Sequence, residues 1–137
     1  MGKKESSLWF RLGNNLKGHF VRVENPLLPG TPDVNYCCGE GNEGWIELKA
    51  SDTPGLLKKL HQCLEYEEAE KLVGLRPEQI AWLFLRSKTG GACYLIIQGV
   101  GCYWLYRATT TGLVLRCAAG GANFWPQVQR ILENRNE

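Results

Sequence analysis

The chain has 137 residues, of which 44% are hydrophobic and 22% are charged, and its formal net charge at pH 7 is +2. This length suits one domain with a hydrophobic core, and the balance of residues excludes wholesale disorder. No stretch reaches the roughly 18 apolar residues of a membrane-spanning helix, and the polar start has no signal-peptide pattern. We therefore expect a single cytoplasmic domain over residues 1–137 with no membrane partner.

The first part of the chain predicts a helix followed by a strand. Leu8, Leu12 and Leu16 recur at the spacing of one helix face, and Gly18 is a suitable helix end. Residues 19–24 then alternate polar and apolar side chains, which is typical of a strand.

Two further strands are expected after a proline-rich loop. Residues 33–38 and 45–50 have strand-like sequences, and a glycine-rich turn separates them, so we expect a β-hairpin. The next segment, residues 51–75, is harder to assign. A helix over residues 58–72 is compatible with its sequence, and we interpret the whole segment as an insertion or a lid.

The second half of the chain predicts alternating helices and strands. Pro77 and Glu78 suit the first turn of a helix that ends near Lys88. The apolar run at residues 93–98 is typical of a buried strand that is reached by a helical crossover. The remaining predicted elements are strands at residues 103–106 and 113–115 and a closing helix at residues 123–134. This order predicts an α/β domain with a mixed sheet and helices on both faces, in which residues 108–137 form a C-terminal extension.

Two compositional features bear on function. Residues 1–25 carry a net charge of +3 (five Lys or Arg, two Glu), residues 26–75 carry −5 (four Lys, nine Asp or Glu), and residues 76–137 carry +4 (seven Lys or Arg, three Glu). Such a pattern suits a protein that holds a polyanion and a divalent cation, although ordinary surfaces also show it. The six cysteines include no CxxC pair, so we interpret all six as reduced, buried side chains.

The candidate chemistry lies in the predicted hairpin. Strand alternation puts Glu47 and Lys49 on one face, and Asp33 begins the partner strand, so the hairpin would bring the two carboxylates together. A divalent cation would relieve their repulsion, and oxygen ligands suit Mg²⁺ or Mn²⁺. Lys49 can position or deprotonate an attacking water, or stabilise charge on a phosphate. The alternative is a surface ion pair between Glu47 and Lys49, with Asp33 as a turn residue.

These residues resemble a known signature. The Pro-Asp pair at residues 32–33 and the Glu-Leu-Lys string at residues 47–49 resemble the motif of the PD-(D/E)XK nuclease superfamily. The segments 29–34 and 44–50 are similar to small phage-type nucleases, which include the virus-type replication-repair nuclease domain (VRR-NUC) and phage Holliday-junction resolvases. The resemblance covers roughly residues 4–107 and implies the restriction-endonuclease-like α-β-β-β-α-β core.

The resemblance also implies roles for individual residues. Asp33 and Glu47 would be metal ligands, the backbone carbonyl of Leu48 would help them, and Lys49 would be the catalytic lysine. Many members of the superfamily add an acidic ligand on the first helix, and Glu5 fits that position. Independently, helical geometry places Glu5 in the middle of the apolar stripe of its helix, where a carboxylate is unusual unless something binds it. The alternative is a solvated Glu5 just before a frayed helix.

A glutamine on the second core helix is another feature of some members. Gln79 matches it and would contact the catalytic lysine or the substrate. The alternative reading of Gln79 is an exposed residue in the first turn of the helix.

The resemblance implies a Mg²⁺- or Mn²⁺-dependent endonuclease that hydrolyses DNA phosphodiester bonds without an organic cofactor. The expected substrate is branched DNA such as a Holliday junction, and the expected form is a homodimer, with Trp9 or Trp125 as candidates for its interface. If the protein is encoded by a phage, it would act in the host cytoplasm. Three alternatives stay open: a flap, end or duplex nuclease of phage replication or repair, a non-catalytic nucleic-acid-binding module, and a structural protein with ordinary surface charges.

Overall fold

The computed structural model describes residues 2–134. Its elements, in chain order, are α1 (Lys3–Asn15), β1 (His19–Arg22), β2 (Val34–Cys38), β3 (Asn42–Ala50), α2 (Leu56–Lys59), β4 (Cys63–Leu64), α3 (Tyr66–Val73), α4 (Pro77–Lys88), β5 (Cys93–Gln98), β6 (Tyr103–Ala108), β7 (Leu113–Ala119) and α5 (Gly121–Glu133). The strands form one seven-stranded sheet in the order β1-β2-β3-β5-β6-β7-β4. None of the helices in this part of the chain combines the length and the apolar character that a membrane crossing requires.

The centre of the sheet is mixed. β2 and β3 form the expected antiparallel hairpin, in which Val34 lies opposite Ile46. β3 and β5 are parallel, with Glu47 beside Leu95, and α4 belongs to the crossover between them. A parallel neighbour requires such a crossover, and both faces of the strand are then covered. The predicted α/β class and mixed sheet are therefore confirmed.

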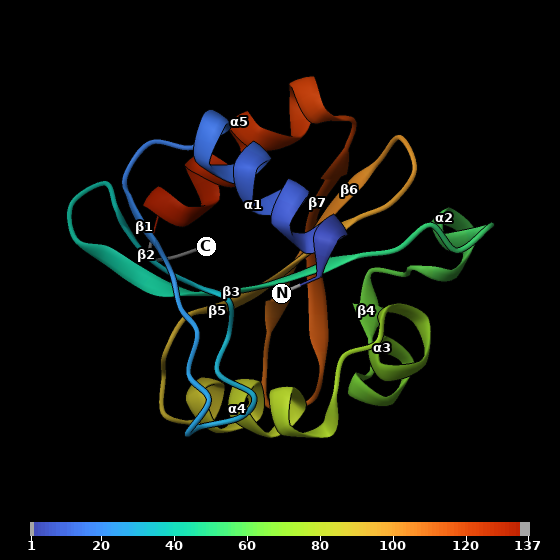
Figure 1. The fold of residues 1–137 in the computed structure, drawn as a ribbon, viewed down its shortest axis with the longest axis horizontal. Helices are drawn as coiled ribbons and strands as arrows, with labels where there is room; N and C mark the ends of the chain where they lie inside the picture. Colours follow the sequence, from blue (N-terminus) through green and yellow to red (C-terminus); the bar gives the residue numbers. More distant parts are fainter. Residues whose placement is uncertain (1, 135–137) are drawn as a thin grey trace.

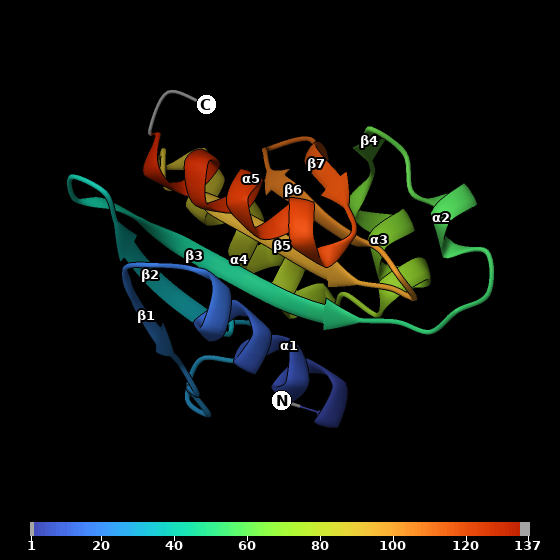
Figure 2. The same ribbon diagram turned by 90° about the horizontal axis from the view of Figure 1, so that it is seen from above.

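Helices cover both faces of the sheet (Figure 1). α1 and α5 lie on one face, and their leucine and isoleucine side chains pack against Ile46 and Leu48 of β3. α3 and α4 lie on the other face, where Leu83 of α4 packs with Leu95 of β5. Figure 2 shows the same layers from above, with α1 and α5 in front of the sheet and α4 behind it. The two apolar clusters hold the sheet between them.

The segment 51–75 extends the sheet. The single helix expected over residues 58–72 is wrong, because the chain forms α2, the edge strand β4 and then α3. β4 pairs with β7 at the end of the sheet, where Leu64 lies opposite Leu113. The break has a local cause, since Glu65 and Glu68 form a reciprocal capping box that begins α3 just after β4.

Two further expectations need correction. Cys63 is exposed, and Cys37 and Cys102 are only half-buried, so the cysteines are not uniformly buried, although all six are free thiols as expected. Cys63 lies on the two-residue strand β4, and its side chain is exposed to solvent there.

Trp125 is buried against Tyr103, with ring centroids 5.5 Å apart, and is therefore not available as a surface for a second copy.

Candidate active site

A pocket of about 220 Å³ lies where the chain before β2 diverges from β3. Its lining residues are Gly2, Glu5, Asp33, Glu47, Leu48, Lys49, Arg76 and Gln79. Every site residue expected from the sequence is in this set. A larger cavity of about 320 Å³ involves the other end of β3, but Glu43 is the one carboxylate among its lining residues. The smaller pocket is therefore the better candidate for metal or acid-base chemistry.

Asp33 reaches the pocket because it lies just before the first residue of β2. Its Oδ2 accepts a hydrogen bond of 2.8 Å from the backbone N–H of Leu48. The N–H of Trp45 donates to Ala92 on the β5 side, so strand alternation turns both the N–H and the C=O of Leu48 toward the Asp33 side. The Leu48 carbonyl and the Asp33 carboxylate therefore lie on the same side of β3, the side that faces β2.

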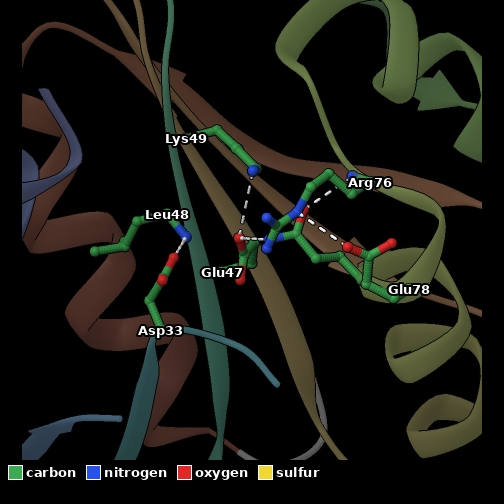
Figure 3. Close-up of polar contacts among 7 residues, drawn as sticks. Asp33, Glu47, Leu48, Lys49, Arg76 and Glu78 are labelled. Atoms are coloured by element: carbon green, nitrogen blue, oxygen red, sulfur yellow. Dashed lines mark hydrogen bonds and ion pairs between the residues drawn. The ribbon is translucent and has the colours of Figure 1, made fainter. Parts of the chain in front are cut away.

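Glu47 is the most deeply buried carboxylate of the site, with 2% of its surface exposed. Its Oε2 accepts a hydrogen bond of 2.7 Å from Nε2 of Gln79 and lies 3.6 Å from Nζ of Lys49. Its Oε1 is buried and accepts no hydrogen bond from a protein N–H group. Figure 3 shows Glu47 and Lys49 projecting from β3 toward Arg76. A buried carboxylate oxygen without a partner is costly, and a bound ligand would satisfy it.

Asp33 and Glu47 both have raised pKa values, which is unusual for carboxyl groups. Burial, together with the charge of Asp33, raises the pKa of Glu47 to about 8 against the opposing effect of Lys49, and a hydrogen bond between the Asp33 and Glu47 carboxyl groups also contributes to the rise. Burial also raises the pKa of Asp33, against the opposing effects of the Leu48 hydrogen bond and of Lys49. Two carboxyl groups whose ionised forms are both disfavoured lie together in one pocket. Such shifts are frequent at functional sites.

Gln79 ties α4 to the site. Its Oε1 accepts a hydrogen bond of 2.9 Å from the backbone N–H of Arg76 at the start of the helix, and its Nε2 donates to Glu47. The side chain is buried, so the reading of Gln79 as an exposed residue is wrong. Its protein contact is with Glu47, whereas the resemblance implied the lysine or the substrate.

The loop before Asp33 supports the same helix end. Gly30 has a φ of +95°, and a Cβ atom at this position would lie 2.2 Å from the carbonyl oxygen of Glu78. Only glycine combines that conformation with such a close approach. The proline-rich loop therefore packs against the first turn of α4 and places Asp33 beside it.

Glu5 lies in the first turn of α1, not before the helix, and is half-buried. It lines the pocket, but among residues 2–134 no three His, Cys, Asp or Glu side chains are grouped closely enough to hold a metal ion together. An ion pair of 2.7 Å between Lys4 and Asp52 links the start of α1 to the segment after β3. Glu5 is thus near the two carboxylates without forming one ligand cluster with them.

Arg76 and Gly2 line the pocket but were not predicted from the sequence, and of the two Arg76 has the charged side chain. It is the N-cap residue of α4, and its Nε lies 3.4 Å from Oε1 of Glu78. An arginine before a proline carries no signature of a site. The available signal was its spacing from Gln79, because an N-cap residue and the residue three positions later come together at a helix start.

The oxygen atoms that line the pocket suit Mg²⁺. The possible metal ligands are the carboxylate oxygens of Asp33 and Glu47 and the carbonyl oxygen of Leu48. Mg²⁺ typically uses one or two carboxylates together with water and phosphate oxygens. The buried Oε1 of Glu47 is a possible metal ligand that accepts no hydrogen bond from a protein N–H group. Within residues 2–134 no third carboxylate clusters with these two, which suits such an ion better than a cage made entirely of protein ligands.

Comparison of the chain with family models, with curated proteins and with solved structures finds no match. The chemistry of the site is therefore inferred from its own residues and geometry. The α/β architecture alone does not define an activity, because one architecture hosts many functions.

Proposed function

We propose that the protein is a metal-dependent endonuclease of the PD-(D/E)XK type that hydrolyses DNA phosphodiester bonds. The observation that supports it most is the pocket in which the buried Glu47 lies beside the half-buried Asp33 and Lys49, and in which Oε1 of Glu47 accepts no hydrogen bond from a protein N–H group. Charges at an ordinary surface pair are solvated, whereas here Glu47 is 2% and Lys49 13% exposed. Because burying such charges is costly, their presence together favours a bound ion.

The order of elements supports the same proposal. α1, β1, β2, β3, α4 and β5 follow one another as in the restriction-endonuclease-like core, with α2, β4 and α3 inserted before α4. The carboxylates lie where β2 and β3 diverge. This support is separate from the short sequence motif, because it comes from the order of the elements and from the pairing of the strands, in which β1-β2-β3 are antiparallel and β3-β5 are parallel.

Each residue of the pocket has a separate role in the proposed reaction. A divalent cation held by Asp33, Glu47 and the Leu48 carbonyl would polarise the scissile phosphate and favour ionisation of the attacking water. Lys49 orients that water or neutralises charge that develops on the phosphate. Gln79 fixes the orientation of the Glu47 carboxylate. Glu5 lines the same pocket from the first turn of α1.

We propose branched DNA such as a Holliday junction as the substrate and a homodimer as the active form, because two symmetric nicks require two active sites. A flap, end or duplex nuclease would use the same residues, since substrate shape is recognised by surfaces outside the catalytic group. A binding module without catalysis would gain nothing from an acidic group at this position, because carboxylates repel DNA phosphates unless a cation lies between them.

A cleavage assay tests the proposal. Wild type, Asp33→Ala and the control Asp52→Asn would be incubated with a four-way junction, a flap, a duplex and a single strand, in Mg²⁺, Mn²⁺ or EDTA. Asp52 is an exposed carboxylate paired with Lys4 and is not among the lining residues. We expect metal-dependent cutting by wild type and by Asp52→Asn, and none by Asp33→Ala. No cutting of any substrate, with no effect of Mn²⁺ on melting temperature, would overturn the proposal.

A further inference from the structure

An aromatic pair with a stacked guanidinium lies on the α4 face of the sheet. The rings of Trp45 on β3 and Trp82 on α4 are 5.2 Å apart and meet edge to face at 67°. The Cζ of Arg86 lies 4.5 Å from the centre of the Trp82 ring and 5.8 Å from that of Trp45. Both indoles are half-buried and Arg86 is exposed. One face of a planar cation therefore rests on the indoles.

This group is next to the candidate active site. Trp45, Glu47 and Lys49 alternate on one face of β3, and a spacing of two residues corresponds to about 7 Å along a strand. Opposite them on α4, Gln79 contacts Glu47 and Trp82, one turn later, contacts Trp45. The distance of about 7 Å equals roughly two base steps at the 3.4 Å rise of DNA. A strand whose phosphate lies at Glu47 would therefore bring a base about two steps away to the tryptophans.

A pocket of about 290 Å³ opens beside the stacked pair. Its lining includes Trp45 and Arg86 together with Asn35 and Glu43 of the β2–β3 hairpin. Nδ2 of Asn35 donates to the carbonyl of Gly44 at 3.1 Å, which fixes the orientation of that side chain. The pocket thus combines a flat cationic wall with polar groups that can meet the edge of a base.

The stacked position of Arg86 on the two indoles depends on the chain after α4 leaving room for its side chain. Gly91 donates its N–H to the carbonyl of Arg86 at 2.9 Å. A Cβ atom at Gly91 would lie 2.5 Å from Cδ of Arg86, so the absence of a side chain at Gly91 leaves room for the stem of the arginine. The guanidinium is therefore positioned before any ligand arrives, which reduces the entropic cost of binding.

We infer that Arg86, Trp45 and the adjacent pocket form a stacking site for one unpaired DNA base beside the scissile phosphate. Flat aromatic and guanidinium surfaces are the common means by which proteins hold an unstacked base. The inference deepens the proposed function and rests on it for the nature of the substrate. The strand would enter with at least one base out of the duplex, as at a branch point or flap.

Binding in EDTA tests the site without cleavage. The probe is a short fluorescein-labelled thymidine oligonucleotide, and the same oligonucleotide with an abasic residue at each position in turn, followed by anisotropy. We expect Arg86→Ala to weaken binding about tenfold, and Lys88→Ala, which removes a charge from the same end of α4, to weaken it about twofold at most. Arg86→Lys should resemble Arg86→Ala, because lysine keeps the charge but not the plane.

A second variant guards against a folding defect. Gly91→Ala should displace the Arg86 side chain and reproduce the loss of affinity with an unchanged circular dichroism spectrum. One abasic position should weaken binding to wild type and have no further effect on Arg86→Ala. Equal losses for Arg86→Ala and Lys88→Ala, full binding by Arg86→Lys, or indifference to every abasic position would overturn the inference.

The two proposals fail differently. Metal-dependent cutting that requires Asp33 but is insensitive to Arg86 and to abasic positions would overturn the base site alone. Position-dependent binding of the oligonucleotide, with no cutting of any substrate and no effect of Mn²⁺ on melting temperature, would overturn the nuclease and keep the base site. Each outcome is read in a separate assay on the full chain.

Discussion

Nε2 of Gln79 donates a hydrogen bond of 2.7 Å to Oε2 of Glu47, across a separation of 32 residues in the sequence. This contact joins the start of the crossover helix α4 to the middle of β3. The same glutamine accepts the N–H of Arg76, so the helix cap and the candidate metal ligand share one side chain. The geometry of the site therefore depends on how α4 is seated.

Gln79→Ala should lower both stability and activity. The change leaves Oε2 of Glu47 with Lys49 as its partner and removes the acceptor for the Arg76 N–H. Loss of hydrogen bonds at a buried carboxylate costs about 1–3 kcal/mol. Urea unfolding and single-turnover cleavage would measure the two effects. Ile80→Ala, a half-buried neighbour on α4 that is outside the pocket, is the control for helix packing. A Gln79→Ala protein with wild-type stability and rate would contradict this role.

Stability without divalent cations should fall as the pH rises from 4.5 to about 8. The pKa of Glu47 is raised from its ordinary value of 4.5 to about 8, so between these values the folded state keeps a proton that the unfolded state has lost. The folded state then binds more protons, and stability decreases with pH. The raised pKa of Asp33 acts in the same direction.

Urea unfolding over this pH range in EDTA would show the slope. Glu47→Gln should flatten it and make the protein more stable than wild type at the alkaline end, because the amide cannot ionise. Glu43→Gln, an exposed position on the same strand, should keep the wild-type slope. A wild-type stability that rises across this range would contradict a buried, protonated Glu47.

Mn²⁺ or Mg²⁺ should raise the melting temperature, and more so at pH 8 than at pH 6. Ligand carboxylates must lose their protons before they bind a cation, so affinity increases as Glu47 and Asp33 ionise. At a cation concentration of one hundred times Kd the stabilisation is about 2.7 kcal/mol. Differential scanning fluorimetry would measure it. Asp33→Asn should lose most of the shift and Asp52→Asn should keep it, and equal shifts in all three proteins would place the cation elsewhere.

The central part of the fold and site was predictable from local patterns. Alternation along β3 puts Glu47 and Lys49 on the face opposite Ile46, and a glycine turn pairs β3 with β2, so Asp33 had to come near Glu47. Both patterns can be recognised from residues that lie close together in the sequence. The register of the hairpin is also fixed, because a slip of one residue would expose the core face of the strand.

The rest depended on tertiary contacts. The edge strand β4 has two residues, and its pairing with β7 spans some fifty positions of sequence, so no local pattern announces it. Gln79 is buried because of the way α4 packs on the sheet. The position of Arg76 depends on the helix start, where its backbone N–H donates to Oε1 of Gln79. For Glu5 the helical stripe predicted its direction toward the pocket, but not its separation from the other carboxylates.

Arg76→Ala should weaken DNA binding with little effect on stability. The guanidinium lines the pocket, and its ion pair with Glu78 is 3.4 Å long between side chains that are 61% and 42% exposed, so the pair adds little to folding. A cation at the rim attracts the phosphate backbone, and removing it should raise KM, leave kcat nearly unchanged and lower the salt dependence of binding by about one phosphate contact. Glu78→Gln is the reciprocal variant: it frees the guanidinium and should tighten binding at low salt. Cleavage kinetics and salt titrations would measure both, and an unchanged KM for Arg76→Ala would show that the arginine serves only as the cap of α4.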